Sequence, residues 1–134
     1  MGNGEWGMEQ LVDGRPDLRE RTKQYALRVI RLVEALPDTV VAQVIARQLL
    51  RAGTSVGANY RAACRSRSQA EFIAKMGIVE EEADESLYWM ELLVESRLVR
   101  LEQLASLMQE GDELVAMTVA SIKTAKKNRR NRAR

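Results

Sequence analysis

The stretch RAGTSVGANYRAACRSRSQAEF, residues 51–72, decides how the chain is expected to pack. Gly53 and Gly57 lie four residues apart among other small residues, so one side of a helix through this stretch carries almost no side-chain bulk. We therefore predict that a neighbouring helix approaches closely there. Each glycine costs roughly 1 kcal/mol relative to alanine inside a helix, so a break near these two residues is the alternative. The stretch lacks the Gly-x4-Gly-Lys-Ser/Thr pattern of a phosphate-binding loop.

Apolar residues at helical spacing predict one helix before this stretch and a second helix that contains it. The first helix covers residues 18–36 and ends at Pro37, because proline fixes its own φ and disfavours helix at the preceding residue. Asp38 or Thr39 is expected to cap the second helix, whose apolar stripe runs through Val41, Val44, Ile45, Leu49 and Val56. The short junction makes the two helices antiparallel neighbours.

Two further helices are predicted after a turn near residues 65–68. Ser66 or Ser68 can cap the third helix, and Ser68 with Glu71 has the Ser-x-x-Glu spacing of a capping box. The third helix carries the longest apolar stripe of the chain, from Phe72 to Val94. A fourth helix is expected over residues 102–126, with Gly111-Asp112 as a weak point inside it.

The predicted domain organisation has three parts. Residues 18–127 form an all-α, antiparallel up-down-up-down four-helix bundle, since amphipathic helices with short connections pack in this way. Residues 1–17 are Gly-rich and acidic and are expected to be a disordered arm, and residues 128–134 a basic disordered tail. No apolar segment reaches the roughly 20 residues that a membrane span requires. Because the lone Cys64 cannot form an internal disulfide, a cytoplasmic protein is expected.

The composition argues against an enzyme. The chain contains no histidine, the commonest general base and transition-metal ligand. The acidic block at residues 80–85 could suggest a di-iron site, but such bundles need Glu-x-x-His motifs, so we predict no metal and no cofactor. We expect the block instead to pair with arginines of the second helix, Arg47 and Arg51 with Glu80, Glu81 and Asp84. Ser55, Asn59 and Cys64 are interpreted as packing and hydrogen-bonding residues, and no catalytic residue is predicted.

Positive charge is concentrated in two places. Residues 123–134 hold seven basic side chains and no acid, whereas the rest of the chain has 14 basic and 19 acidic side chains. Phosphate contacts release counterions, so such clusters bind nucleic acid with little sequence preference. Interleaved aromatics for base stacking are missing, which argues against specific recognition of single strands. The predicted nucleic-acid-binding residues are Arg61, Arg65, Arg67, Lys75, Lys123, Lys126, Lys127, Arg129, Arg130 and Arg132; a solvated helix end is the alternative.

Three apolar residues, Trp89, Leu92 and Leu93, lie off the main stripe of the third helix. A second apolar face of this kind suggests contact with another chain, and we predict that these residues form an oligomer interface. A wide face toward the protein's own core is the alternative. If the interface receives a different protein, the chain is an interaction scaffold without a role in nucleic-acid binding.

The segment RAGTSVGANYRAACRSRSQAEFIAKMGIVEEEADESLYWMELL, residues 51–93, resembles the bacterial four-helix-bundle proteins encoded by intervening sequences in 23S rRNA genes, also called S23 ribosomal proteins. The resemblance rests on the spacing of Arg51, Ser55 and Asn59 and on the Glu-rich helix that ends in Glu-Leu-Leu. It extends over about residues 22–125. These proteins are related to the accessory variability proteins of diversity-generating retroelements.

The resemblance implies a bundle that assembles as a ring-like homopentamer and has no enzymatic activity. In the retroelement branch it implies a basic protein that binds RNA or DNA together with a reverse transcriptase. This chain departs from that branch because it is acidic outside its C-terminal residues. Nucleic-acid binding, as an accessory factor of an RNA-containing complex, is therefore expected to depend on Arg61, Arg65, Arg67 and the basic tail.

Overall fold

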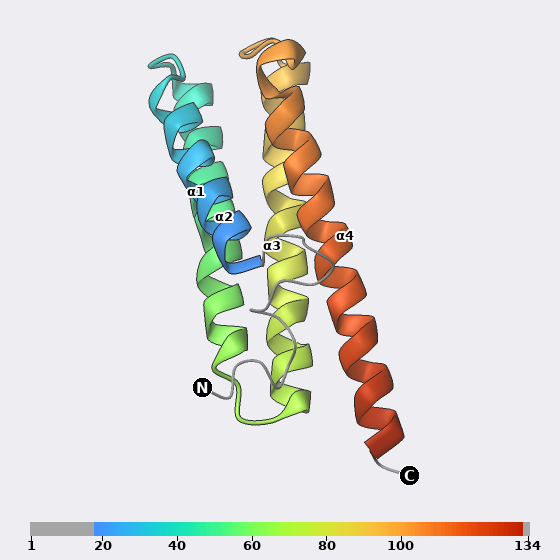
Figure 1. The fold of residues 1–134 in the computed structure, drawn as a ribbon. Helices are drawn as coiled ribbons and strands as arrows, with labels where there is room; N and C mark the ends of the chain where they lie inside the picture. The colour runs from blue at the N-terminus through green and yellow to red at the C-terminus, as the bar shows by residue number, and fades with distance from the viewer. Residues whose placement is uncertain (1–17, 133–134) are drawn as a thin grey trace.

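The computed structural model describes residues 18–132, which form four helices: α1 (Leu18–Glu34), α2 (Val40–Cys64), α3 (Gln69–Glu95) and α4 (Leu101–Arg132). Consecutive helices run in opposite directions (Figure 1), and no strand occurs in the described range. The all-α up-down-up-down bundle is thus confirmed. The predicted arm lies outside the described residues. Helix α4 continues through Arg132, so the segment expected to be a disordered tail is helical as far as that residue.

Both predicted caps at the start of α2 and α3 are present. The Thr39 hydroxyl accepts a hydrogen bond from the Ala42 amide at 3.2 Å, and the Ser68 hydroxyl accepts one from the Glu71 amide at 3.1 Å. The Glu71 carboxylate reaches back to accept from the amide of Arg67 at 2.7 Å. These contacts satisfy amides that lack a partner within the helix, and they fix the turn that carries Arg65 and Arg67.

The glycines of α2 lie at its contact with α1. A Cβ at Gly53 would be 2.8 Å from the nearest Val29 side-chain atom, and one at Gly57 would be 3.2 Å from the Thr22 hydroxyl. Helix α2 is unbroken through this region, so the predicted close contact is confirmed and the alternative of a break is wrong. Because Gly53 and Gly57 have no side chains, the backbones of α1 and α2 can approach each other closely here.

A second close contact lies at Gly111, where the sequence suggested only a weak point. Helix α4 is continuous there, and a Cβ at Gly111 would be 2.8 Å from both the Leu87 side chain and the Tyr25 hydroxyl. Tyr25 is fully buried, and its hydroxyl lies 2.7 Å from the Ser86 hydroxyl. Since Ser86 donates to the carbonyl of Ala83, Tyr25 is the donor of this bond, which links α1 to α3 beside α4.

Because the Tyr25 hydroxyl is buried, the free energy of unfolding depends on pH in the alkaline range. Burial raises its pKa to about 12, although the hydrogen bond with Ser86 acts in the opposite direction. In the unfolded chain this hydroxyl ionises near pH 10. Its contribution to the free energy of unfolding is therefore complete below pH 10 and is lost as the pH rises toward 12. We expect a loss of about 2–3 kcal/mol over this range that Tyr25→Phe removes. Urea unfolding of both proteins between pH 8 and 11.5 measures it; parallel losses in the two proteins would contradict this assignment.

Candidate nucleic-acid interface

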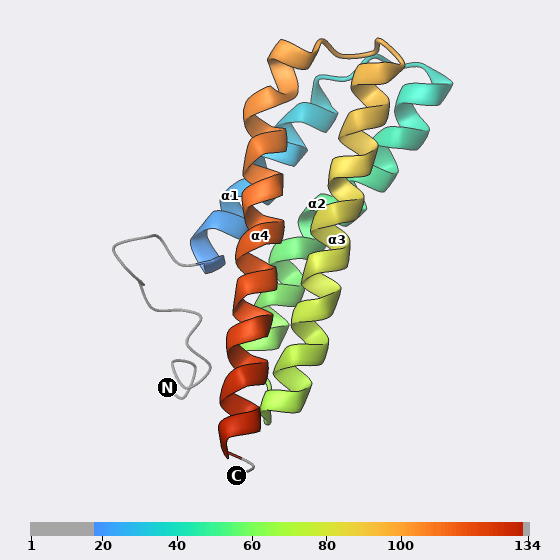
Figure 2. The same ribbon diagram turned by 90° about the vertical axis from the view of Figure 1, so that its right-hand side faces the viewer.

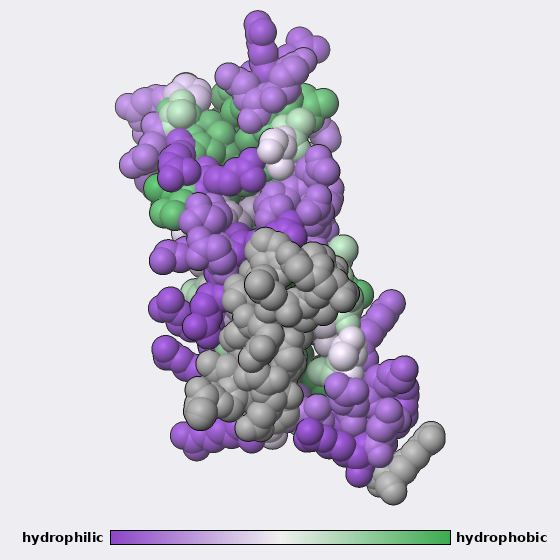
Figure 3. Space-filling view, viewed as in Figure 1, coloured by the Kyte–Doolittle hydropathy of each residue, from purple (hydrophilic) through white to green (hydrophobic). Residues whose placement is uncertain are grey.

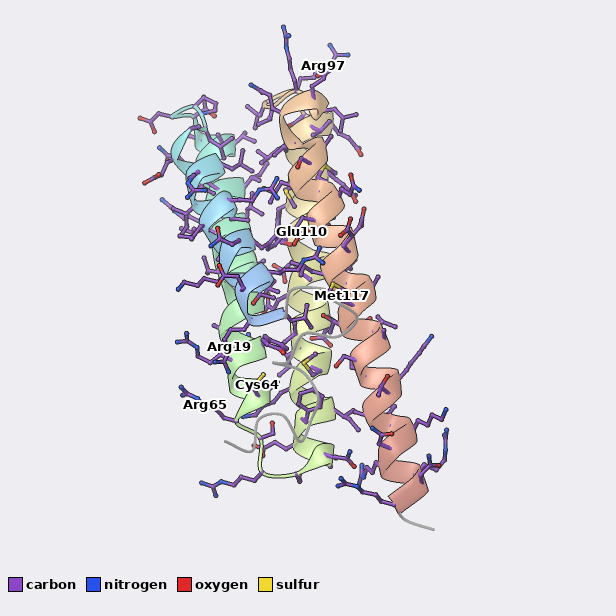
Figure 4. All side chains as sticks on the ribbon, in the orientation of Figure 1. Arg19, Cys64, Arg65, Arg97, Glu110 and Met117 are labelled. Carbon is purple, nitrogen blue, oxygen red and sulfur yellow. The ribbon has the colours of Figure 1, made fainter. Side chains whose placement is uncertain are left out.

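The two predicted basic groups lie at the same end of the bundle. The α2–α3 turn and the C-terminal end of α4 lie at the same end of the bundle in both ribbon views (Figures 1 and 2), and in Figure 1 the start of α3 lies between them. Figure 4 places Arg65 at this end and Arg97 at the opposite end. Helix α1 begins only partway along the bundle, where Thr22 meets Gly57, so the last residues of α2 and α4 extend beyond it. We call residues 61–75 and 117–132 the basic end.

The packing of α3 against α4 determines how the basic end is assembled. Gly111 packs against Leu87, and both helices rise 1.5 Å per residue. Arg129 and Gln69, each 18 residues from this contact, are therefore level with one another in the antiparallel pair. Since Gln69 is the first residue of α3, Arg130 and Arg132 lie beyond the start of α3, at the height of the turn that carries Arg65 and Arg67.

Charge is strongly separated along the bundle axis. The basic end holds ten Lys and Arg side chains and a single acid, Glu71, whereas the other described residues hold nine basic and fourteen acidic side chains. The basic end thus carries a formal charge of +9 and the remainder −5. The surface over the C-terminal part of α4 is accordingly hydrophilic (Figure 3). The small formal net charge of the whole chain, +2, does not reveal this separation.

The cations of the basic end are almost all free of carboxylate partners. Lys75 pairs with Glu71 at 3.4 Å, and the other nine are exposed and make no ion pair within residues 18–132. Elsewhere arginines are used structurally: Arg21 contacts Glu110 at 2.6 Å and Glu113 at 2.7 Å. Cations in the last helical turn of α4 also stabilise that helix through its dipole. The dipole of α4 does not explain the arginines of the α2–α3 turn.

Glu71 is engaged within the protein. It accepts the Arg67 amide and pairs with Lys75, and these contacts hold the pKa of its carboxyl below the usual range. The carboxylate is therefore ionised at neutral pH and holds the start of α3 in place. It offsets one of the ten positive charges, and the basic end keeps its excess.

The acidic block of α3 pairs with α2, but through other residues than predicted. Arg51 contacts Glu82 at 3.1 Å and also binds Glu85, whereas the prediction named Glu80, Glu81 and Asp84. Arg47 makes no ion pair in the described part of the chain. The level along the helices was predicted correctly, but the rotation of α3 was not, because only the Glu82 and Glu85 side of α3 faces Arg51.

The predicted oligomer interface is wrong for Leu93, which is completely buried in the bundle core. Trp89 and Leu92 are half-buried against the core, so the alternative of a wide core face holds in part. The Trp89 indole donates to the Glu85 carboxylate at 3.0 Å. Leu93 is lost to the interface because α3 packs against both α2 and α4 and therefore needs two apolar sides.

Exposed apolar residues do accompany Trp89 and Leu92. Val41 and Val44, which the sequence assigned to the core stripe, are 56% and 52% exposed, and Tyr88 is 52% exposed. Val44 lies seven residues before Arg51, and Trp89 and Leu92 lie seven after the two glutamates that bind it. Seven residues make two helical turns, so these three side chains share one face across α2 and α3. We call Val41, Val44, Tyr88, Trp89 and Leu92 the apolar patch.

The residues considered for catalysis have structural roles. The Ser55 hydroxyl donates to the carbonyl of Arg51 at 2.6 Å, the Asn59 amide donates to the carbonyl of Ser55 at 2.8 Å, and Cys64 is buried. Within residues 18–132, no group of three His, Cys, Asp or Glu side chains could hold a metal ion. None of the described helices is long and apolar enough to cross a membrane.

Comparison with known proteins gives a family and a solved relative. A family model described as 23S rRNA-intervening sequence protein matches residues 17–120. A crystal structure of a protein with unknown function from the S23 ribosomal protein family of Bacteroides thetaiotaomicron VPI-5482 is 34% identical to the chain, with a TM-score of 0.74. The similarity covers 78% of this chain and 97% of that one. None of the curated proteins compared matches. The α4 cations from Lys123 onward lie outside the family match.

Proposed function

The chain belongs to the 23S rRNA-intervening sequence protein family, and from this we propose that it is a non-enzymatic, self-associating bundle whose basic end binds nucleic acid. The observation that carries the proposal is the gathering of ten cations from two separate segments, nine of them exposed and without an ion-pair partner among residues 18–132. Assembling so much like charge costs folding energy unless an anion neutralises it. A phosphate backbone supplies such anions at regular spacing.

The binding is electrostatic and largely independent of sequence. Each cation that neutralises a phosphate releases a condensed counterion, so affinity falls steeply as salt increases. The family takes its description from intervening sequences of 23S rRNA, so RNA is the first ligand to test and DNA the second. In this function the chain acts as an accessory factor in an RNA-containing complex, where a reverse transcriptase is one candidate partner.

Binding rather than catalysis is favoured by the use that the fold makes of its reactive side chains. Ser55 and Asn59 bond to backbone carbonyls of their own helix, and Cys64 is enclosed near the α2–α3 turn. The hydroxyl of Ser55 and the amide of Asn59 are thus engaged within α2, and burial keeps the Cys64 thiol away from a substrate in solution. The bundle therefore serves as a rigid support for the charges at its end.

A filter-binding titration of the full chain against a 20-nucleotide RNA and DNA, each single- and double-stranded, tests the proposal. We expect binding at 50 mM salt that weakens by about 1,000-fold at 200 mM if six phosphates are contacted. The same titration with uncharged peptide nucleic acid is the control. Failure to bind any of the charged ligands at 50 mM salt would overturn the proposal and leave the interaction scaffold as the alternative.

Self-association is a second candidate, supported by the apolar patch. Tyr88 and Trp89 stack edge to face with their centroids 5.0 Å apart, which presents a rigid aromatic surface beside Val44. Rigid aromatic anchors of this kind dominate the energetics of protein interfaces. We propose that the patch meets a second copy of the chain, in a ring of five as the resemblance implies. The other possible occupant is a different protein.

We expect Val44→Asp to weaken self-association at least tenfold, because it places a charge in the middle of the apolar patch. Trp89→Ala should act in the same direction by removing the aromatic anchor. Sedimentation equilibrium over a range of protein concentrations measures the effect, with Gln103→Asp as the control, because this exposed residue lies on α4, which contributes no residue to the patch. A monomeric parent protein would contradict the proposal and favour a heterologous partner.

A further inference from the structure

The arginines at the tip of the basic end lie on two elements, the α2–α3 turn and the C-terminal end of α4. Arg129 and Arg132 follow buried Ala125 by four and seven residues, so they lie within about 40° of the side of α4 that packs on α3. Both are level with or past the first residue of α3, so they lie at the same height along the bundle as the turn that carries Arg65 and Arg67. Four exposed arginines thus lie at this end of the bundle, and within residues 18–132 the only carboxylate of the basic end is Glu71, which Lys75 and the Arg67 amide already occupy.

The remaining α4 cations form a separate stripe. Lys123, Lys126, Lys127 and Arg130 are spaced three, four and seven residues apart, and they lie opposite the buried side marked by Ser121 and Ala125. This stripe continues the positive surface from the tip along the outer side of α4. The basic end thus offers cations on two helical supports, not in a single line.

The separation of the two supports suits a duplex groove. Packed helices such as α3 and α4 lie about 8–10 Å apart, the turn leads into the start of α3, and arginine side chains extend several ångströms beyond the backbone. The major groove of B-DNA is about 12 Å wide, and duplex RNA has a wide minor groove with phosphates along both edges. The turn and α4 can therefore reach the two strands that border one groove.

The basic end also lacks what single strands need. Proteins bind unpaired nucleic acid by stacking its bases on aromatic side chains, at about 1–3 kcal/mol per base. The aromatic residues of the basic end that the structure describes, Phe72 and the neighbouring Tyr60, are completely buried. The exposed ring of Tyr88 lies 19 residues farther along α3 than Gln69, well away from the tip. Without rings for stacking, the exposed cations favour contacts to phosphates, and a duplex carries twice as many phosphates per unit length.

We infer that the basic end binds a nucleic-acid duplex by its phosphates, with Arg65 and Arg67 on one strand and Arg129 and Arg132 on the other. This inference rests on the proposed function and specifies its ligand. RNA and DNA duplexes share the chemistry, and the experiment distinguishes them. Base edges are not read, so the preference is for the form of the nucleic acid and not for its sequence.

The test measures the affinity of the full chain for a 20-base-pair RNA duplex, a DNA duplex of the same sequence, and their separated strands, by fluorescence anisotropy at several salt concentrations. We expect at least one duplex to bind about tenfold tighter than either of its strands, with a salt slope near −0.9 per phosphate contacted. Arg65→Gln with Arg67→Gln, and Arg129→Gln with Arg132→Gln, should each reduce that slope by about two. The pair Arg47→Gln and Arg100→Gln, which removes the same charge at the other end, should leave it unchanged.

Equal or tighter binding of the single strands would overturn the inference while leaving the proposed function standing. The inference would also be overturned if Arg65→Gln with Arg67→Gln left duplex binding unchanged, because the turn would then contact neither strand. Absence of binding to every ligand at 50 mM salt would overturn the proposed function and the inference together. Circular dichroism of each variant shows whether the helices remain folded, and glutamine retains helix propensity at the α4 positions.

Discussion

Replacing the six cations of α4 with glutamine is expected to weaken nucleic-acid binding by about 100-fold or more at 50 mM salt. The reason is the loss of up to six counterion-releasing contacts, which should also reduce the salt slope by about five. Glutamine is a good helix former, so α4 should keep its length and the bundle its fold. The substituted residues are Lys123, Lys126, Lys127, Arg129, Arg130 and Arg132. Filter binding against RNA and DNA duplexes measures the effect.

A control with the same change in net charge is available within the chain. Six exposed cations lie outside the basic end and make no ion pair in the described range: Arg19, Lys23, Arg31, Arg47, Arg97 and Arg100. Replacing these six with glutamine should reduce affinity by less than about tenfold, through the weaker long-range field. If both variants lose affinity equally, net charge and not the basic end would govern binding.

Gly53→Leu is expected to destabilise the bundle by about 3 kcal/mol or more, the largest effect on stability that the structure predicts. A Cβ at this position would be within 2.9 Å of both Val29 methyl groups, and the longer leucine side chain would separate α1 from α2. Both helices bury apolar residues along this contact, so separating them also exposes core surface. Urea unfolding followed by circular dichroism measures the free energy of unfolding.

Gly77→Leu is the matched control, because a Cβ at Gly77 in α3 meets nothing within 4 Å. The same substitution should there stabilise the protein by about 0.5–1 kcal/mol, the difference in helix propensity between glycine and leucine. A similar destabilisation at both positions would mean that helix packing at Gly53 does not set the spacing of α1 and α2. Gly111→Ala should fall between them, since Tyr25 and Leu87 crowd that site.

The sequence predicted those parts of the fold that depend on local rules. Thr39 and Ser68 cap their helices because their side chains can reach amides two or three residues ahead. The close contact at Gly53 follows from a stripe of small residues, which admits a neighbour whatever its identity. Gly111 was interpreted as a weak point because its contacts, Leu87 and Tyr25, lie far away in the chain and no local pattern indicates them.

Rotation about a helix axis was the main source of error. The pairing of Arg51 with α3 was predicted at the right level, but the acidic residues alternate around the helix, and the structure selects Glu82 and Glu85. Val44 was assigned to the core and Leu93 to the surface for the same reason. A helix with two packed neighbours has a wide apolar face, and its edges cannot be located from spacing alone.

The sequence named the basic residues of the candidate interface, but it did not show that the two groups lie at one end of the bundle. Arg65 and Arg129 lie on segments that the sequence treated as a turn and a disordered tail, and the packing of α4 on α3 brings them to one end. The helix extends through Arg132 because its last residues are mostly good helix formers. This extension turns a charged tail into a support with fixed spacing.

Lysine footprinting tests the central claim most directly. The chain has five lysines. Four lie in the basic end, Lys75, Lys123, Lys126 and Lys127, and the fifth, Lys23, is an exposed residue of α1 outside it. Acetylation with and without saturating RNA duplex, read by mass spectrometry, should show protection of the four and an unchanged rate at Lys23. Equal modification of all five with and without RNA, or protection of Lys23 alone, would contradict binding at this end.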